Sequence, residues 1–131
     1  MNYFFAAALG TILFLTLFPF RLVPGAHLSD FGWRIARTIL LAPRSGDAAR
    51  NVLLFLPFGY AAMSVFFART RFAAVTCWLI AIGCGVALSV FVEGAQVFLP
   101  RRITNIYDVL FNGVGTALGA TAAAWWPRRK P

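Results

Sequence analysis

The residues of this chain that are best suited to chemistry lie within 93–112, where a glutamate, a glutamine, two arginines, two asparagines and an aspartate interrupt a strongly apolar sequence. A carboxylate near arginine and amide groups has the parts of a general base with a neighbouring positive charge that stabilises a developing anion. The candidate catalytic residues are Glu93, Asp108 and Arg102. The wider predicted polar cluster consists of Arg50, Asn51, Glu93, Gln96, Arg101, Arg102, Asn105, Asp108 and Asn112.

No residue near this cluster is a convincing nucleophile. Ser89 lies one helical turn before Glu93, where a serine hydroxyl commonly bonds back to its own helix. Tyr107 is expected to be an interfacial aromatic residue, and His27, the single histidine, to be solvated or interfacial. The cysteines and the histidine form no metal-binding pattern, and no cofactor is indicated. The sequence therefore does not specify a reaction.

Two readings of the polar cluster stay open. In the first, the carboxylates pair with arginines and the amides join neighbouring helices, although such contacts within a membrane contribute only about 0.6 kcal/mol each. In the second, three arginines against two carboxylates leave a surplus positive charge that binds an anionic or polyhydroxyl ligand. Arginine suits phosphate and carboxylate groups because its guanidinium forms two parallel hydrogen bonds. We favour the second reading.

The composition indicates an integral membrane protein. Of 131 residues, 60% are hydrophobic and 12% are charged, whereas soluble domains carry about 25% charged residues. The length suits one domain, residues 1–131. The net charge of +8 does not indicate nucleic-acid binding, because the basic residues flank apolar runs, where they orient membrane helices and contact anionic lipids.

The apolar runs predict an all-α membrane protein with a bundle of four transmembrane helices. Each run is long enough to cross about 30 Å of hydrocarbon, and no strand pattern is present. The predicted spans are residues 3–20, 51–68, 72–98 and 106–126.

The first loop is the only long one, and it has its own helical pattern. Apolar residues recur at helical spacing within 29–42, while two arginines lie off that stripe. We predict a short interfacial amphipathic helix here; the alternative is an irregular loop.

The predicted topology brings the polar residues together. Spans 51–68 and 106–126 begin, and span 72–98 ends, on the same side of the membrane. On the last span, Asp108 and Asn112 share one helical stripe with Gly115 and Gly119, whose small size lets another helix approach closely. Residues expected to serve helix packing are Pro57, Gly59, Gly115 and Gly119.

The arginines give conflicting signals on orientation. A raw count favours the side of the polar cluster as cytoplasmic. However, Arg50, Arg101 and Arg102 adjoin the cluster, and without them the count becomes five to four in favour of the opposite side. We predict that both termini are cytoplasmic.

An ordered set of motifs resembles the VanZ-like family of bacterial membrane proteins. The resemblance is carried by "LTLFPF" (15–20), "RNVLLFLPFGY" (50–60), "SVFVEGAQVFLPRR" (89–102) and "NIYDVLFNGVGTALG" (105–119). Asp47 loosely fills the place of an acidic residue that precedes the asparagine of the second span. The resemblance implies four helices in a bacterial inner (plasma) membrane and a link to glycopeptide (teicoplanin-type) resistance or cell-envelope metabolism. It does not supply a reaction.

Two functions from different classes follow. The first is a VanZ-like envelope protein whose polar mouth binds, or acts on, a lipid-linked or peptidoglycan-related anionic group. The second is a non-catalytic subunit of a larger membrane assembly, respiratory or photosynthetic, in which the polar cluster only joins the helices. Expected partners are membrane lipids and either a larger membrane complex or further copies of the chain, but no nucleic acid.

Overall fold

The computed structural model describes residues 3–18, 46–96, 99 and 105–125, and within these ranges all the regular secondary structure is helical. The prediction of an all-α protein is confirmed for this part of the chain, which contains no strand. The described helices are α1 (Tyr3–Leu17), α3 (Asp47–Arg69), α4 (Ala74–Gln96) and α5 (Ile106–Trp125). The helix predicted within 29–42 lies outside the described residues, as do Arg101, Arg102 and His27.

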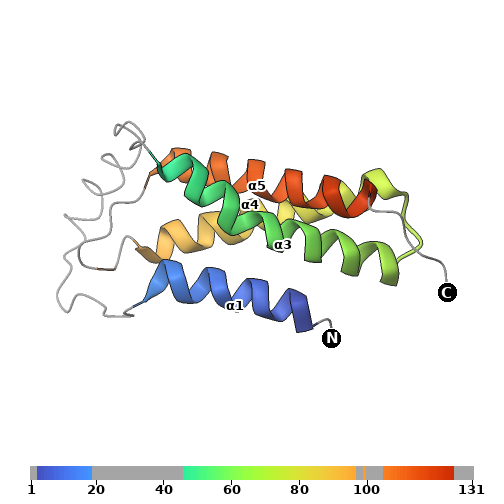
Figure 1. Cartoon of the computed structure of the whole chain (residues 1–131), viewed down its shortest axis with the longest axis horizontal. Helices are drawn as coiled ribbons and strands as arrows, with labels where there is room; N and C mark the ends of the chain where they lie inside the picture. Colours follow the sequence, from blue (N-terminus) through green and yellow to red (C-terminus); the bar gives the residue numbers. More distant parts are fainter. Residues whose placement is uncertain (1–2, 19–45, 97–98, 100–104, 126–131) are drawn as a thin grey trace.

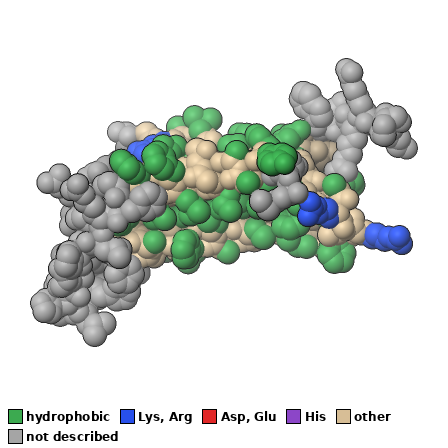
Figure 2. Space-filling model, turned by 90° about the horizontal axis from the view of Figure 1, so that it is seen from below, with side chains coloured by type: hydrophobic (Ala, Val, Ile, Leu, Met, Phe, Trp, Pro, Cys, Tyr) green, Lys and Arg blue, Asp and Glu red, His purple; other side chains and the backbone are tan. Residues whose placement is uncertain are grey.

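Two of the described helices have the length and composition of a membrane span. Helices α3 and α4 each contain 23 residues and are apolar enough to cross a bilayer, while α1 is apolar but shorter. Figure 2 shows hydrophobic side chains along the flank of the molecule, with Lys and Arg near its two ends. An apolar flank between charged ends is typical of a membrane protein.

Helix α3 begins four residues before the predicted span. Gly46 has a φ of 95°, which turns the chain sharply before the helix, and Asp47 follows in the first turn. A carboxylate there stabilises the positive end of the helix dipole. Arg50 therefore lies inside the helix. Pro57 is also inside α3, which continues to Arg69 and changes direction in its middle, as expected where proline removes a backbone hydrogen bond (Figure 1).

All four helices run along the long axis of the molecule (Figure 1). Helices α3 and α5 begin at the end where α1 and α4 finish, so α3 and α5 are parallel neighbours. Helix α1 packs against α3 and α4; the rings of Phe5 and Phe58, for example, lie 5.4 Å apart. The largest fully buried apolar side chains, which come from α1, α3 and α4, are Phe55, Ile12, Met63 and Val92.

The middle of the contact between α3 and α5 brings backbone against backbone. A Cβ atom added at Gly115 would overlap the carbonyl of Val52, and one at Gly119 would overlap that of Leu56. A Cβ atom at Gly59 would in turn overlap the backbone of Thr116. We call Gly59, Gly115, Gly119 and Thr116 the glycine contact. It fixes how α3 and α5 lie side by side.

Candidate functional site

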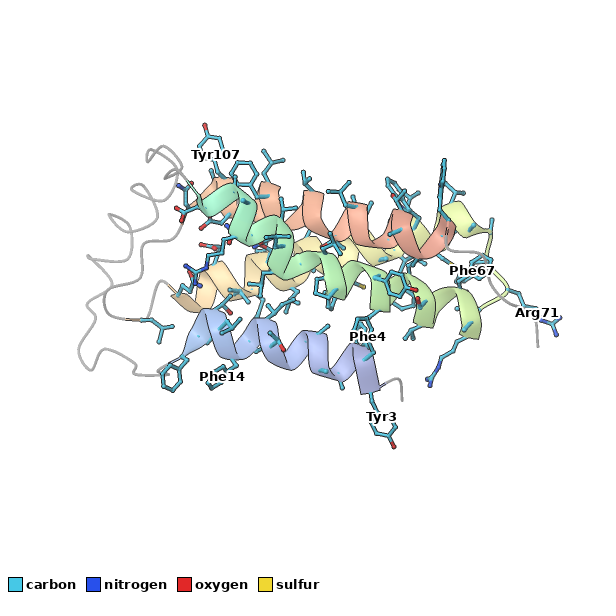
Figure 3. All side chains as sticks on the ribbon, in the orientation of Figure 1. Tyr3, Phe4, Phe14, Phe67, Arg71 and Tyr107 are labelled. Atoms are coloured by element: carbon cyan, nitrogen blue, oxygen red, sulfur yellow. The ribbon has the colours of Figure 1, made fainter. Side chains whose placement is uncertain are left out.

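The helix arrangement gathers the described polar residues at one end of the bundle. Figure 3 shows side-chain oxygen and nitrogen atoms concentrated there, on the side where Tyr107 is labelled. We call this the polar end. Its described members come from the start of α3, the end of α4 and the start of α5, and they are Asp47, Arg50, Asn51, Glu93, Gln96, Asn105, Asp108 and Asn112.

Glu93 and Asn105 together close the hairpin between α4 and α5. Asn105 caps α5, because its Oδ1 accepts a hydrogen bond from the backbone N–H of Tyr107 at 3.0 Å. The backbone N–H of Asn105 donates to Glu93 Oε2 at 3.2 Å. In a capping box this second bond is made by the residue three positions into the helix. Here the preceding helix supplies the carboxylate, so Glu93 has a structural partner.

Gln96 also has a structural partner. Its Nε2 donates to the backbone carbonyl of Thr16 near the end of α1, at 3.1 Å. The side chain is buried. Gln96 therefore holds α1 against the polar end of α4, and one N–H of its amide is used in doing so.

Asn112 lies deeper in the bundle and contacts Ser89. It is only 3% exposed, and its Nδ2 donates to Ser89 Oγ on α4 at 2.8 Å. Ser89 was expected to bond back to its own helix. It joins two helices because α5 brings a donor to its buried hydroxyl, which the sequence of α4 alone does not reveal.

Three buried polar atoms at this end have no hydrogen-bond partner within the described part of the chain: Asn51 Nδ2, Asp108 Oδ1 and Asn112 Oδ1. The Asn51 amide faces the Asp108 carboxylate closely enough to influence it, yet the two atoms lack hydrogen-bonding geometry. A buried polar atom without a partner costs about 1–3 kcal/mol. Such atoms commonly mark the place of a water, an ion or a ligand.

The described charges at the polar end are mainly negative. The carboxylates of Glu93 and Asp108 lie near enough to interact, and Asp47 and Arg50 both act on Asp108. No ion pair is found between two residues of the described ranges. Arg50 therefore does not form with a described carboxylate the ion pair that the first reading of the cluster requires, and helix joining here rests on hydrogen bonds.

Sequence reasoning missed Thr116. It is fully buried, donates from Oγ1 to the Asn112 carbonyl at 2.9 Å, and lies where a Cβ atom at Gly59 or Gly85 would fall. A signal was available, since Thr116 follows Asn112 by four residues and flanks Gly115. It extends the polar stripe of α5 into the bundle.

These features define an all-helical protein of membrane type with a polar end built from three helices. A family model described as VanZ/LLP1 matches residues 3–127, and the chain belongs to that family. The resemblance found in the sequence motifs is thereby confirmed. A search of curated proteins and a search of solved structures found no match.

Proposed function

We propose that the protein is a multi-pass protein of a bacterial inner (plasma) membrane whose polar end binds an anionic group of the cell envelope. The group would be carried by a lipid-linked or peptidoglycan-related molecule. The observation that carries the binding of a molecule is the set of three buried, unpartnered polar atoms on Asn51, Asp108 and Asn112, whereas its anionic character is inferred from the arginines of the sequence. These atoms do not stabilise the bundle, because they form no hydrogen bond within it. A bound molecule would provide their hydrogen-bond partners.

The four-span reading is part of this proposal, with residues 1–131 as one domain. Helix α5 has 20 residues, which corresponds to about 30 Å of helix. Helix α1 has 15 residues, lies beside α3 and α4, and falls within the predicted span 3–20. Both termini would be cytoplasmic, which places the polar end on the outer side. Alkaline phosphatase fused after Arg71 or at the C-terminus should then be inactive; active fusions would reverse the orientation.

Arginine would supply the positive charge for an anionic group. In the sequence, Arg101 and Arg102 fall between Gln96 and Asn105, which both belong to the polar end. Among the described residues, Glu93 accepts from the backbone of Asn105, and Arg50 acts on Asp108 without forming an ion pair with it. The guanidinium group of an arginine can form bidentate bonds to phosphate or carboxylate.

The test is a comparison of single variants in a host in which the protein produces a measurable envelope phenotype, such as altered susceptibility to teicoplanin. Glu93→Gln, Arg102→Ala and Asp108→Asn should each abolish the phenotype while the protein accumulates in the membrane at the normal level. Arg71→Ala is the matched control, because Arg71 lies at the opposite end (Figure 3). If all three variants kept full activity, the proposal that the polar end is a binding site would be wrong.

A second candidate is a non-catalytic subunit of a larger membrane complex. The observation in its favour is the apolar outer face of α4 and α5, where Val75, Leu79, Leu110 and Leu118 are each more than half exposed. Lipid covers such a face equally well. Gentle detergent extraction followed by size analysis separates the two. A stoichiometric large complex supports the subunit role, and a lone monomer or homodimer opposes it.

A further inference from the structure

Three residues of the polar end carry the unpartnered atoms, and we call them the inner subsite: Asn51, Asp108 and Asn112. Asp108 and Asn112 are four residues apart on α5 and so lie on one face of that helix. Asn51 faces Asp108 from α3. The inner subsite thus lies between two parallel helices, just outside the glycine contact that sets their separation.

The burial of Asn112 shows that the inner subsite lies inside the protein and not on its surface. Its side chain is 97% buried, and one end of its amide is occupied by Ser89 of α4. The other end of the same planar group points away from that bond and has no partner. Whichever way the amide is turned, Ser89 bonds to one end and leaves the other unpaired. The inner subsite therefore contains a buried polar atom of Asn112 without a hydrogen-bond partner.

The chemistry of the inner subsite discriminates among ligands. An anion placed there would lie against the Asp108 carboxylate, with Glu93 and Asp47 close by and Arg50 as the opposing positive charge. An ammonium group can donate to Asp108 but has no lone pair for the Asn51 amide nitrogen. A hydroxyl group both donates and accepts, so it can satisfy a carboxylate and an amide together. In the absence of a ligand, a water molecule can form the same hydrogen bonds, because it also donates and accepts.

We propose that the inner subsite binds hydroxyl groups of a sugar or polyol head group, while the anionic group of the same molecule lies outward of it. The inference rests on the proposed function, and it narrows the ligand class from any anionic envelope group to a hydroxylated one. Binding replaces water with ligand hydroxyls on Asn51, Asp108 and Asn112. No covalent step is involved.

The experiment measures lipid retention by the full-length protein in phosphatidylcholine nanodiscs, using native mass spectrometry. Four test lipids with the same acyl chains are added one at a time. Phosphatidic acid carries phosphate alone, phosphatidylglycerol carries phosphate and two free hydroxyls, and monoglucosyl diacylglycerol carries sugar hydroxyls alone. Diacylglycerol, with a single hydroxyl, is the reference. The wild type should retain phosphatidylglycerol about tenfold better than phosphatidic acid, since one or two well-made hydrogen bonds correspond to about that factor. It should also retain the glucosyl lipid better than diacylglycerol.

Variants assign the preference to the inner subsite. Asn51→Leu and Asp108→Asn should each reduce the preference for hydroxylated lipids about tenfold. The matched control is Thr121→Val, which removes a hydroxyl from α5, the helix of Asp108, near its opposite end, where it accepts from Trp78 Nε1. This control should keep the preference. Helix content, measured by circular dichroism, verifies that each variant is folded.

The possible results separate the two proposals. Retention of phosphatidic acid without any preference for hydroxylated lipids overturns this inference and leaves the proposed function standing. The same follows if the preference exists but survives both inner-subsite variants. If no head group is retained above diacylglycerol, both proposals fall. A preference lost in Asn51→Leu and Asp108→Asn but kept in Thr121→Val supports the assignment.

Discussion

The glycine contact and the inner subsite belong to the same pair of helices but are built to opposite rules. In the glycine contact, backbone lies on backbone, and Cβ atoms at Gly115 and Gly119 would overlap carbonyls of α3. In the inner subsite, less than two turns away on α5, three buried polar atoms have no partner among the described residues. One region is filled completely, and the other leaves hydrogen-bonding capacity unused.

The difference shows which region stabilises the protein and which one does not. Helix association in a membrane depends on close packing, because lipid is as apolar as the side chains and provides no hydrophobic drive. The glycine contact supplies that packing. The unpaired polar atoms oppose stability, so their presence is better explained by binding. Stability and binding should therefore respond separately to substitutions in the two regions.

The largest effect is expected in the glycine contact. Gly119→Ala places a methyl group on the backbone of Leu56, which cannot move away as a flexible side chain could. Overpacking of this kind destabilises by about 1–3 kcal/mol. Gly83→Ala on α4 is the matched control, because no atom of the described chain lies within 4 Å of the added methyl. Unfolding of both variants in a mild detergent, titrated with sodium dodecyl sulfate, measures the difference.

Gly83→Ala should be neutral or stabilising by up to about 1 kcal/mol, since alanine favours helix more than glycine does. Equal stability of the two alanine variants would mean that α3 and α5 do not meet at Gly119. It would also remove the fixed separation from which the geometry of the inner subsite is argued.

The helices and the polar end could be predicted from the sequence because both depend on periodicity and on topology. The ordered spacing of Asp108, Asn112, Gly115 and Gly119 places them on a single face of a helix, and alternating helices bring α3, α4 and α5 to a common end. Helix starts were harder. The predicted span begins after Arg50, whereas α3 begins at Asp47, because the positive φ of Gly46 cannot be read from residue types.

Individual partners could not be predicted. Polar pairing depends on the rotation of each helix about its axis, which packing decides. Ser89 thus accepts from Asn112, and Gln96 donates to the backbone of α1, a contact that leaves no pattern in the sequence. Likewise, the sequence showed that Glu93 and Asn105 belonged together, but not that the backbone of Asn105 would be the donor.

An intermediate effect is expected at the cap of α5, where the polar end contributes to stability. Asn105→Ala removes the acceptor for the Tyr107 backbone N–H and should destabilise by about 1 kcal/mol. Asn105→Asp keeps an acceptor in that place and should retain most of the stability. The same detergent titration measures both. If alanine and aspartate behave alike, the cap does not hold the α4–α5 hairpin closed.

The smallest effect on stability, and the most informative, is expected within the inner subsite. Asn51→Leu removes a buried donor that has no described partner, so the free energy of unfolding should change by less than about 0.5 kcal/mol or increase. Ser89→Ala is the contrast, because it deprives Asn112 of a real bond and should cost about 0.6 kcal/mol or more. Asn51→Leu should nevertheless lose the preference for hydroxylated lipids. A variant that is stable yet unable to bind would separate the two regions, whereas a strongly destabilised Asn51→Leu would show that this asparagine holds the helices together.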